Sequence, residues 1–288
     1  MFSVGIFADL HDWHTKQIKL YLEKFGCKVY IVNFSDLVLS FTNNKDFFFG
    51  KDFKLDGVWV RFLGSGSLEE ITTKLTILHL LEEKKVYVHN SPKVIEKTVD
   101  KVRSTGIMKL NNISTPDTFV WKGKALNKLK IDKEENFLIK PIFGSQGKNI
   151  FFLKKKSLLN KIKPTGDIFY LQKFIGNINQ KIYRDIRVMV SNHRVVCSME
   201  RSSKNYITNI YQGANFKKVD ISKDISELCK KISRTFKLGY GGIDLKIFKK
   251  SPYVLEINSI PSWKAIQQTE KKNIAKTLVK DFLKKIEG

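Results

Sequence analysis

One segment near the C-terminus constrains both the local structure and the chemistry of this chain. Residues 241–258, GGIDLKIFKKSPYVLEIN, hold two runs of alternating apolar residues on either side of the turn-forming letters KKSP. This pattern predicts a β-hairpin. With the turn centred near Lys250, Asp244 lies across from Glu256. Glu256 and Asn258 share a face because side chains repeat every two residues along a strand, so all three are expected to converge on one patch.

This patch is a candidate metal site. Two carboxylates directly opposite each other destabilise a sheet unless something neutralises their charge. Two carboxylates and an amide oxygen form an all-oxygen ligand set that suits Mg²⁺, with phosphates and waters completing the octahedron. The alternative is a solvated polar face, since Leu255 and Ile257 suit a half-buried strand in either case.

A second segment combines a strand with glycines. Residues 137–153, FLIKPIFGSQGKNIFFL, predict a strand ending in Lys140, a loop with Gly144 and Gly147, and a second strand. Glycines let backbone N–H groups wrap an anion, and a lysine offers a point charge for phosphate. The segment is not a Walker A loop, because no GK[ST] sequence opens a helix. An ordinary hairpin turn is an equal alternative for this segment taken alone.

Two further segments suit a nucleotide and a carboxylate. The short strand Tyr170–Ile175 offers a backbone donor and acceptor beside an apolar slot for adenine, or it is a plain core strand. Asp185 and Arg187 alternate on a strand, and Arg201 follows Glu200 at the end of the next one. Paired arginines suit a carboxylate substrate or a developing oxyanion, and surface ion pairing is the alternative.

The first part of the chain alternates strands and helices. This alternation predicts a small parallel α/β unit over about the first 90 residues. Residues 91–113 are expected to be helical, opened by Ser91-Pro92. The sequence His11-Asp12-Trp13-His14 indicates a loop or helix start rather than a metal cluster.

Composition and charge narrow the class of protein. Hydrophobic residues make up 42% of the sequence, a fraction that is typical of a globular protein. There are 52 Lys+Arg against 28 Asp+Glu, a formal net charge of +24 that attracts nucleic acid, anionic membranes, nucleotides or acidic substrates. The scattered Cys27, Cys197 and Cys229 indicate neither a disulfide framework nor a zinc site. No signal peptide and no membrane span are indicated, so a cytoplasmic protein is expected.

Taken together in this order and spacing, the segments resemble the ATP-grasp superfamily, and within it the RimK-like α-L-glutamate ligases. The resemblance covers nearly the whole chain. It is carried by Val60-Arg61, His89-Asn90-Ser91-Pro92, Asp100-Lys101, Ile139-Lys140-Pro141 with 144–147, Leu171 to Ile175, Asp185-Ile186-Arg187, Glu200-Arg201, Thr208-Asn209, Gly242-Ile243-Asp244 and Leu255 to Asn258.

The resemblance implies an α/β (α+β) class, namely an ATP-grasp fold with an N-terminal Rossmann-like pre-ATP-grasp domain. The implied parts are an N-terminal α/β domain over 1–90, a helical connection over 91–120, a lid subdomain over 121–175 and a C-terminal catalytic subdomain over 176–288.

The resemblance also implies roles for individual residues. Lys101 and Lys140 would hold the phosphates of ATP, under a loop formed by Gly144, Ser145, Gln146 and Gly147. The adenine would be lined by Gln172, Lys173, Phe174 and Ile175, with Asp185 toward the ribose. The metal ligands would be Asp244, Glu256 and Asn258, holding two Mg²⁺ ions, with Mn²⁺ as a substitute. The catalytic residues near the acyl phosphate and the substrates would be Arg187, Arg201 and Asn209.

The activity implied is an ATP- and Mg²⁺-dependent ligase that adds L-glutamate to an acceptor carboxylate through an acyl phosphate. Gln212-Gly213-Ala214 stands where enzymes that modify a ribosomal protein have an arginine followed by two glycines. Likewise, the residues from Ser259 to Trp263 stand after Asn258 where those enzymes have a small, glycine-rich segment. Together with 64–70, these departures are more similar to the branch associated with tetrahydromethanopterin-type cofactors.

The expected partners are therefore small molecules, L-glutamate and an acidic acceptor of that cofactor type, without a membrane or a nucleic acid. A ribosomal protein, a peptide or a carrier protein is the alternative acceptor. A non-catalytic, basic nucleic-acid-binding protein is the alternative from another class, and a homo-oligomer is left open.

Overall fold

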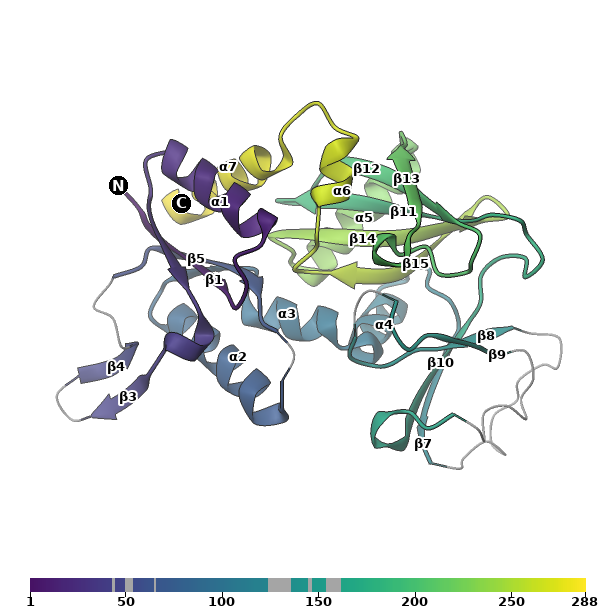
Figure 1. Ribbon diagram of the computed structural model, residues 1–288, viewed down its shortest axis with the longest axis horizontal. Coiled ribbons are helices and arrows are strands. Elements are labelled where there is room, and N and C mark those ends of the chain that lie inside the picture. Colours follow the sequence, from purple (N-terminus) through teal and green to yellow (C-terminus); the bar gives the residue numbers. More distant parts are fainter. Residues whose placement is uncertain (43–44, 50–53, 65, 124–135, 145–146, 154–161) are drawn as a thin grey trace.

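The computed structural model describes residues 1–42, 45–49, 54–64, 66–123, 136–144, 147–153 and 162–288. Over these residues the strands form one parallel sheet, two antiparallel sheets and a small hairpin. Figure 1 shows the parallel sheet at one end of the molecule and the two antiparallel sheets toward the other. Among the described residues, no helix is long and apolar enough to cross a membrane. The proposed domain boundaries stay predictions.

The N-terminal sheet has the strand order β2-β1-β5-β6, and its pairings are parallel. Helices α1 and α2 belong to hydrophobic clusters on its two faces, as parallel sheets require, and this explains the near-continuous apolar strands. The expected parallel α/β unit is confirmed, whereas the hairpin of β3 and β4 was not predicted. The elements are β1 Ser3–Ala8, α1 Trp13–Lys24, β2 Lys28–Val32, β3 Leu39–Thr42, β4 Lys45–Phe49, β5 Gly57–Phe62, α2 Leu68–Glu83 and β6 Tyr87–His89.

The sequence HDWH begins α1, as expected. The side chain of Asp12 accepts a hydrogen bond from the backbone N–H of Thr15 at 2.8 Å and so caps the helix. The same carboxylate contacts His14 Nδ1 at 2.7 Å and Arg61 at 3.1 Å. His14 Nε2 accepts from the backbone N–H of Trp263 at 3.0 Å, and burial lowers the pKa of His14. The motif therefore joins the N-terminal sheet to the segment after the last strand.

The helical stretch expected over 91–113 is confirmed, and it is divided into α3 Pro92–Val99 and α4 Lys101–Leu110. Asp100 between them has an extended backbone, with φ −84° and ψ 104°. Its side chain accepts hydrogen bonds from the N–H groups of Val102 at 2.8 Å and Arg103 at 3.0 Å. Aspartate is favoured at a helix N-cap rather than inside a helix, so a new helix starts here. Lys101 is thereby the first residue of α4.

The second sheet is antiparallel, with the order β7-β10-β8-β9. Its apolar side chains form a separate small core that includes Phe137, Phe169 and Leu171. The strands are β7 Thr118–Lys122, β8 Phe137–Ile139, β9 Phe151–Leu153 and β10 Ile168–Lys173.

The third sheet is antiparallel, with the order β13-β12-β11-β14-β15. Helix α5 packs on one face through Ile232 and Phe236. Ile266 of α6 and Leu278 of α7 belong to the cluster on the other face, which includes Met189. The elements are β11 Tyr183–Ser191, β12 Arg194–Ser203, β13 Asn215–Lys218, α5 Lys223–Phe236, β14 Tyr240–Phe248, β15 Ser251–Asn258, α6 Lys264–Gln268 and α7 Ile274–Glu287.

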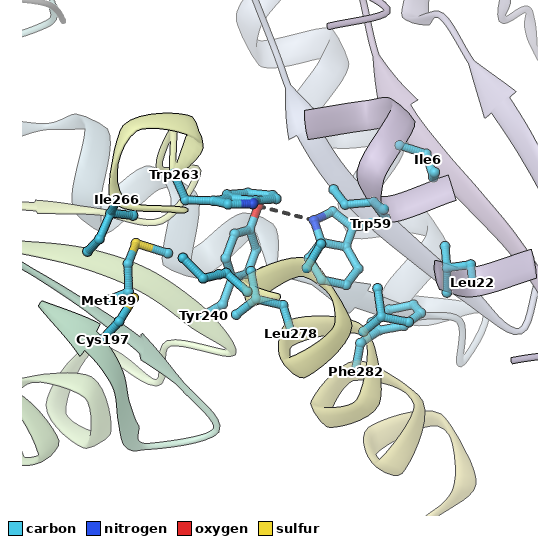
Figure 2. Close-up of a cluster of buried hydrophobic side chains, with 14 of the residues drawn as sticks. Ile6, Leu22, Trp59, Met189, Cys197, Tyr240, Trp263, Ile266, Leu278 and Phe282 are labelled. Atoms are coloured by element: carbon cyan, nitrogen blue, oxygen red, sulfur yellow. Dashed lines mark hydrogen bonds between the residues drawn. The ribbon is translucent and has the colours of Figure 1, made fainter. Parts of the chain in front are cut away.

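A cluster of aromatic residues joins the first sheet to the third (Figure 2). Trp59 of β5 donates a hydrogen bond from Nε1 to the hydroxyl of Tyr240 on β14 at 3.2 Å. The Trp59 ring also lies 5.1 Å from that of Phe282 on α7, centroid to centroid. Because these three side chains are fully buried, the N-terminal sheet and the third sheet share one core.

Candidate active site

The hairpin of β14 and β15 pairs Asp244 with Glu256, as predicted, but it does so through a bulge. The turn residues Lys249 and Lys250 both have positive φ, 48° and 67°, which is typical of a two-residue hairpin turn. Such a turn pairs Leu245 with Val254. By simple alternation Asp244 would then face Leu255. The extra residue in β15 moves Glu256 opposite Asp244 instead.

The bulge also changes what faces the adjoining cavity. Leu255 and Glu256 are neighbours in sequence, yet both line this cavity, while Val254 and Ile257 are buried in the core behind them. An apolar side chain and a carboxylate are thereby presented side by side.

The cavity has a volume of about 120 Å³ and lies between the second and third sheets. It brings together many of the predicted site residues, which come from α4, the end of β8, the glycine loop, the segment after β12, and strands β11, β12, β14 and β15. Those that line it are Lys101, Lys140, Gly144, Gly147, Asp185, Arg201, Asn209, Asp244 and Glu256.

Other predicted residues lie elsewhere. Arg187 contacts Asp244 from outside the cavity lining, and Asn258 lies opposite Gly242 on the neighbouring strand. The predicted adenine residues Gln172, Lys173, Phe174 and Ile175 do not line the cavity. Ser145 and Gln146 lie outside the described residues, and all the assigned roles stay predictions.

Two lysines approach the carboxylates of the hairpin. Lys101 Nζ lies 3.6 Å from Glu256 Oε1 and donates to the backbone oxygen of Gly144 at 3.0 Å. Lys140 Nζ donates to Gln172 Oε1 at 2.6 Å. Burial lowers the pKa of Lys140 to about 8, with Lys101 adding to the effect and Glu256 opposing it. The arrangement places positive charge beside the glycine loop, where phosphate groups would need it.

The floor of the cavity is an ion-pair network across three adjacent strands. Asp185 lies opposite Arg201, and Arg187 lies opposite Asp244, in the registers of β11 with β12 and with β14. Arg201 donates to both oxygens of Asp185, at 2.7 and 2.6 Å, and lies 3.0 Å from Asp244. Thr208 adds a hydrogen bond to Asp185 at 2.6 Å. The charges alternate, so each buried ion has an opposite partner.

The electrostatics of Asp244 follow from this network. Burial alone would raise the pKa of Asp244, but the guanidinium groups of Arg187 and Arg201 lower it to about 2. The pKa of Arg201 is raised by Asp244 and Asp185 against the opposing effect of burial. Arg201 therefore keeps its charge in the low-dielectric floor of the cavity, where a fixed charge acts strongly on a developing anion.

The donor set fits a hard divalent cation. Three N–H groups point at the oxygens of Asp244, and since a carboxylate has about four lone-pair sites, Oδ1 retains room for a cation. Glu256 is partly exposed and faces it across the hairpin. Asn258 could offer only its amide oxygen to the cation, since its Nδ2, which is buried without a partner among the described residues, is a hydrogen-bond donor. The described residues hold no cluster of three or more His, Cys, Asp or Glu that could bind a metal, and the ligand set of Asp244, Glu256 and Asn258 stays a prediction.

Several residues of the cavity had no role in the sequence analysis. Leu138, Ile150 and Leu255 supply apolar lining, and Tyr206 and Ile207 line the cavity from the segment after β12. The alternating pattern around residue 255 could not reveal its position, because the bulge breaks the alternation. Thr208 belonged to a recognised motif, but only the tertiary structure shows its hydrogen bond to Asp185.

A cavity held between two antiparallel sheets, with lysines on one side and opposed carboxylates on the other, defines the class of ATP-grasp ligases. Within that class, the chain belongs to the family with the RimK-like ATP-grasp domain, whose model matches residues 98–282. Members of this class use ATP and Mg²⁺ to form amide-type bonds, and the expected fold and class are confirmed.

The sequence similarity to two relatives covers nearly the whole chain. The tetrahydromethanopterin:alpha-L-glutamate ligase of Methanococcus maripaludis is 30% identical over 288 residues, covering 97% of each chain. The enzyme of the same name from Methanocaldococcus jannaschii is 30% identical over 296 residues, covering 99% of this chain and all of its own.

Solved structures share the fold. The ATP-grasp ligase PsnB complexed with a minimal precursor superimposes with a TM-score of 0.77 at 16% identity over 99% of both chains. The D-alanine–D-alanine ligase of Bacillus anthracis complexed with ATP gives 0.69 at 13% identity, covering all of this chain and 98% of its own.

Proposed function

We propose that this protein is an ATP-dependent ligase that joins the amine of L-glutamate to a carboxylate of a tetrahydromethanopterin-type cofactor. The observation that carries the ligase chemistry is the juxtaposition of Asp244 and Glu256 with Lys101 and Lys140 around one cavity. The identity of the acceptor rests on the two relatives named for that cofactor, which match over nearly the full chain.

In the first step, an oxygen of the acceptor carboxylate attacks the γ-phosphorus of ATP and ADP leaves. Phosphoryl transfer depends mostly on positioning and on neutralising charge. Lys101 and Lys140 carry the positive charge nearest the glycine loop and would hold the phosphates. The product of this step is an acyl phosphate on the acceptor.

In the second step, the glutamate nitrogen attacks the acyl carbon, the bond from carbon to the phosphate oxygen breaks, and the amine loses a proton. Negative charge develops on the acyl oxygen as the tetrahedral species forms. Arg201, with Arg187 behind it, supplies a fixed positive charge for this oxygen. No nucleophilic side chain of the protein takes part in either step.

Asp244, Glu256 and Asn258 would hold the metal. When bound, Mg²⁺ neutralises phosphate charge and fixes the orientation of ATP. We further propose that the site holds two metal ions and that Mn²⁺ can replace Mg²⁺.

We also propose that the protein is located in the cytoplasm. This location is supported by the three cysteines Cys27, Cys197 and Cys229, which are free and buried.

To test this proposal, we would measure ADP release by the purified protein in the presence of MgATP and L-glutamate. The reaction is run first without an acceptor and then with one candidate acceptor at a time. A tetrahydromethanopterin-type cofactor, a ribosomal protein and a model peptide are supplied separately, and products are weighed by mass spectrometry. We expect ADP release coupled to a gain of one glutamyl mass on the cofactor alone. A mass gain on the ribosomal protein or the peptide instead would assign a different acceptor to the same ligase.

The same preparation tests the remaining alternatives. Steeply salt-dependent RNA binding without ATP turnover would favour a nucleic-acid-binding protein of high positive charge. Sedimentation of the protein with and without ATP gives its oligomeric state.

A further inference from the structure

The glycine loop between β8 and β9 is held by a side chain at each of its described ends. Lys101 Nζ donates a hydrogen bond to the backbone oxygen of Gly144 at 3.0 Å. Gln212 Nε2 donates to the backbone oxygen of Gly147 at 2.9 Å. Lys101 already has a predicted role with the phosphates of ATP, whereas no role has been assigned to Gln212. Its contact with the loop therefore needs a functional explanation.

The backbone of Gln212 is fixed by a tight turn. This residue ends the 3₁₀ turn Ile210–Gln212, and its backbone N–H donates to the backbone oxygen of Asn209 at 3.0 Å. Asn209 Oδ1 accepts from the N–H of Tyr211 at 2.9 Å. Gly213 follows in the left-handed conformation, with φ 85°, which a glycine adopts without strain. The side chain of Gln212 therefore extends to the loop from a backbone that is held by hydrogen bonds.

Other residues of the segment after β12 contact the same loop and the strand that follows it. The hydroxyl of Tyr206 donates to the backbone oxygen of Ile150 at 3.3 Å. The Tyr206 ring lies 5.4 Å from that of Phe152, centroid to centroid. Lys148 Nζ lies over the ring of Tyr211, 5.4 Å from its centroid. These contacts keep the segment beside the loop, so that the side chain of a glutamine can reach the loop backbone.

The hydrogen bond from Gln212 orients one peptide group of the loop. The peptide that joins Gly147 to Lys148 is planar, and its C=O and N–H point in opposite directions. Because the C=O is directed to Gln212, the N–H of Lys148 is directed to the opposite side. Gly147 and Lys148 line the candidate active site, whereas Gln212 is not among the described residues that line it. Backbone N–H groups of such loops are donors for phosphate, and Gln212 fixes the direction of one of them.

We propose that Gln212 is a positioning residue for the phosphates of ATP, and that it acts through the backbone of Gly147. Its side chain is exposed and lies outside the cavity lining, so it serves the nucleotide and does not contact the acceptor carboxylate. An amide suits this task, because its NH₂ group donates to a carbonyl oxygen without adding charge. The inference rests on the proposed function and assigns this residue to one of its substrates.

The test compares the full-length parent protein with Gln212→Met and Asn205→Ala. Methionine has nearly the length of glutamine but lacks the N–H donor, and Asn205 is an exposed amide of the same segment outside the cavity lining. Calorimetry measures the binding of a nonhydrolysable MgATP analogue, and mass spectrometry measures backbone hydrogen exchange without nucleotide. We expect Gln212→Met to bind the analogue about fivefold more weakly, the effect of one hydrogen bond. The peptide that contains Gly147 should exchange faster, and Asn205→Ala should match the parent protein.

Steady-state kinetics separate a positioning role from a general structural one. In Gln212→Met the KM for ATP should rise severalfold, while kcat and the KM for the acceptor stay close to those of the parent protein. The midpoint of urea unfolding should not change, because the hydrogen bond to Gly147 lies at the exposed surface.

Two results would overturn the inference. One is an equal affinity of Gln212→Met and the parent protein for the ATP analogue, and the other is a rise confined to the KM for the acceptor. A parent protein that binds the analogue but transfers glutamate to no acceptor would instead count against the proposed function. The binding comparison would still decide the role of Gln212 in that case.

Discussion

Arg187 and Asp244 lie opposite each other on β11 and β14, and two hydrogen bonds of 2.6 Å join the guanidinium to the two carboxylate oxygens. Asp244 is therefore both a predicted metal ligand and the counter-charge of two arginines, the buried Arg201 and the partly buried Arg187. Glu256, its partner across the hairpin, is more exposed and lies 3.6 Å from one lysine. The two carboxylates should respond differently to mutation.

Asp244→Ala should destabilise the protein by about 3–5 kcal/mol, because it leaves the buried Arg201 and the partly buried Arg187 with an incomplete set of partners. Glu256→Gln should change the free energy of unfolding by less than about 1 kcal/mol, since Glu256 makes a partly exposed ion pair. Both should lower Mg²⁺-dependent ADP release by at least tenfold. Urea denaturation and ADP assays measure the two effects. Full turnover by Glu256→Gln would contradict the metal assignment.

Asp185→Asn tests whether Asp185 serves the ribose or Arg201. Both of its oxygens accept hydrogen bonds from Arg201, and one accepts from Thr208 as well. We expect kcat to fall at least tenfold, while the preference for ATP over 2′-deoxy-ATP stays as in the parent protein. A loss of that preference, with kcat for ATP maintained, would support the predicted ribose contact instead.

Gly147→Ala should weaken ATP binding through a steric effect. Gly147 has φ +69°, and an added Cβ would lie 2.8 Å from a methyl group of Ile207. Gly123→Ala is the matched control, since Gly123 has φ +70° but no atom of the described residues within 4 Å of the added atom. Both variants carry the backbone strain of a positive φ. Equal ATP dissociation constants for the two variants would show that the contact with Ile207 is unimportant.

Lys140 should make ATP binding sensitive to mildly alkaline pH. Its pKa in the folded protein is about 8, lowered from 10.5 by burial. The affinity for ATP should therefore decline as pH rises through about 8, because the ammonium that attracts phosphate is lost. Lys140→Gln should bind ATP more weakly at pH 7 with a flatter profile, as measured by titration of the nucleotide. A parent profile without an inflection between pH 7 and 10 would contradict this role.

The same shift predicts the pH dependence of stability. Between pH 8 and 10.5 the unfolded chain binds the Lys140 proton more strongly than the folded chain does. The contribution of Lys140 to the free energy of unfolding should therefore increase with pH across this window. The difference between the parent and Lys140→Gln isolates that contribution.

His89 should destabilise the fold in acid. Burial lowers its pKa to about 3, from 6.5, with Lys285 adding to the effect. The unfolded chain binds more protons between pH 6.5 and 3, so stability should fall as pH is lowered through this window, by up to about 1.4 kcal/mol per pH unit. His89→Gln should reduce that slope in urea denaturation series. An unchanged slope would mean that His89 is protonated in the folded protein.

Local patterns in the sequence were enough to predict much of the fold and part of the candidate site. Strand–helix alternation predicted the parallel N-terminal unit, because side-chain period and turn residues are properties of short segments. The hairpin itself followed for the same reason, whereas the opposition of Asp244 and Glu256 within it depends on the bulge at Leu255. The family resemblance supplied the order of the motifs along the chain, and the fold and family matched it.

Only the tertiary structure decided which distant groups meet. The break at Asp100 and the bulge at Leu255 depend on hydrogen bonds and packing that no alternation records. The pairing of Asp185 with Arg201 depends on which strands become neighbours. Which strands and helices become neighbours depends on the free energy of packing the whole core, to which every buried side chain contributes. These contacts can therefore be seen only in the folded structure.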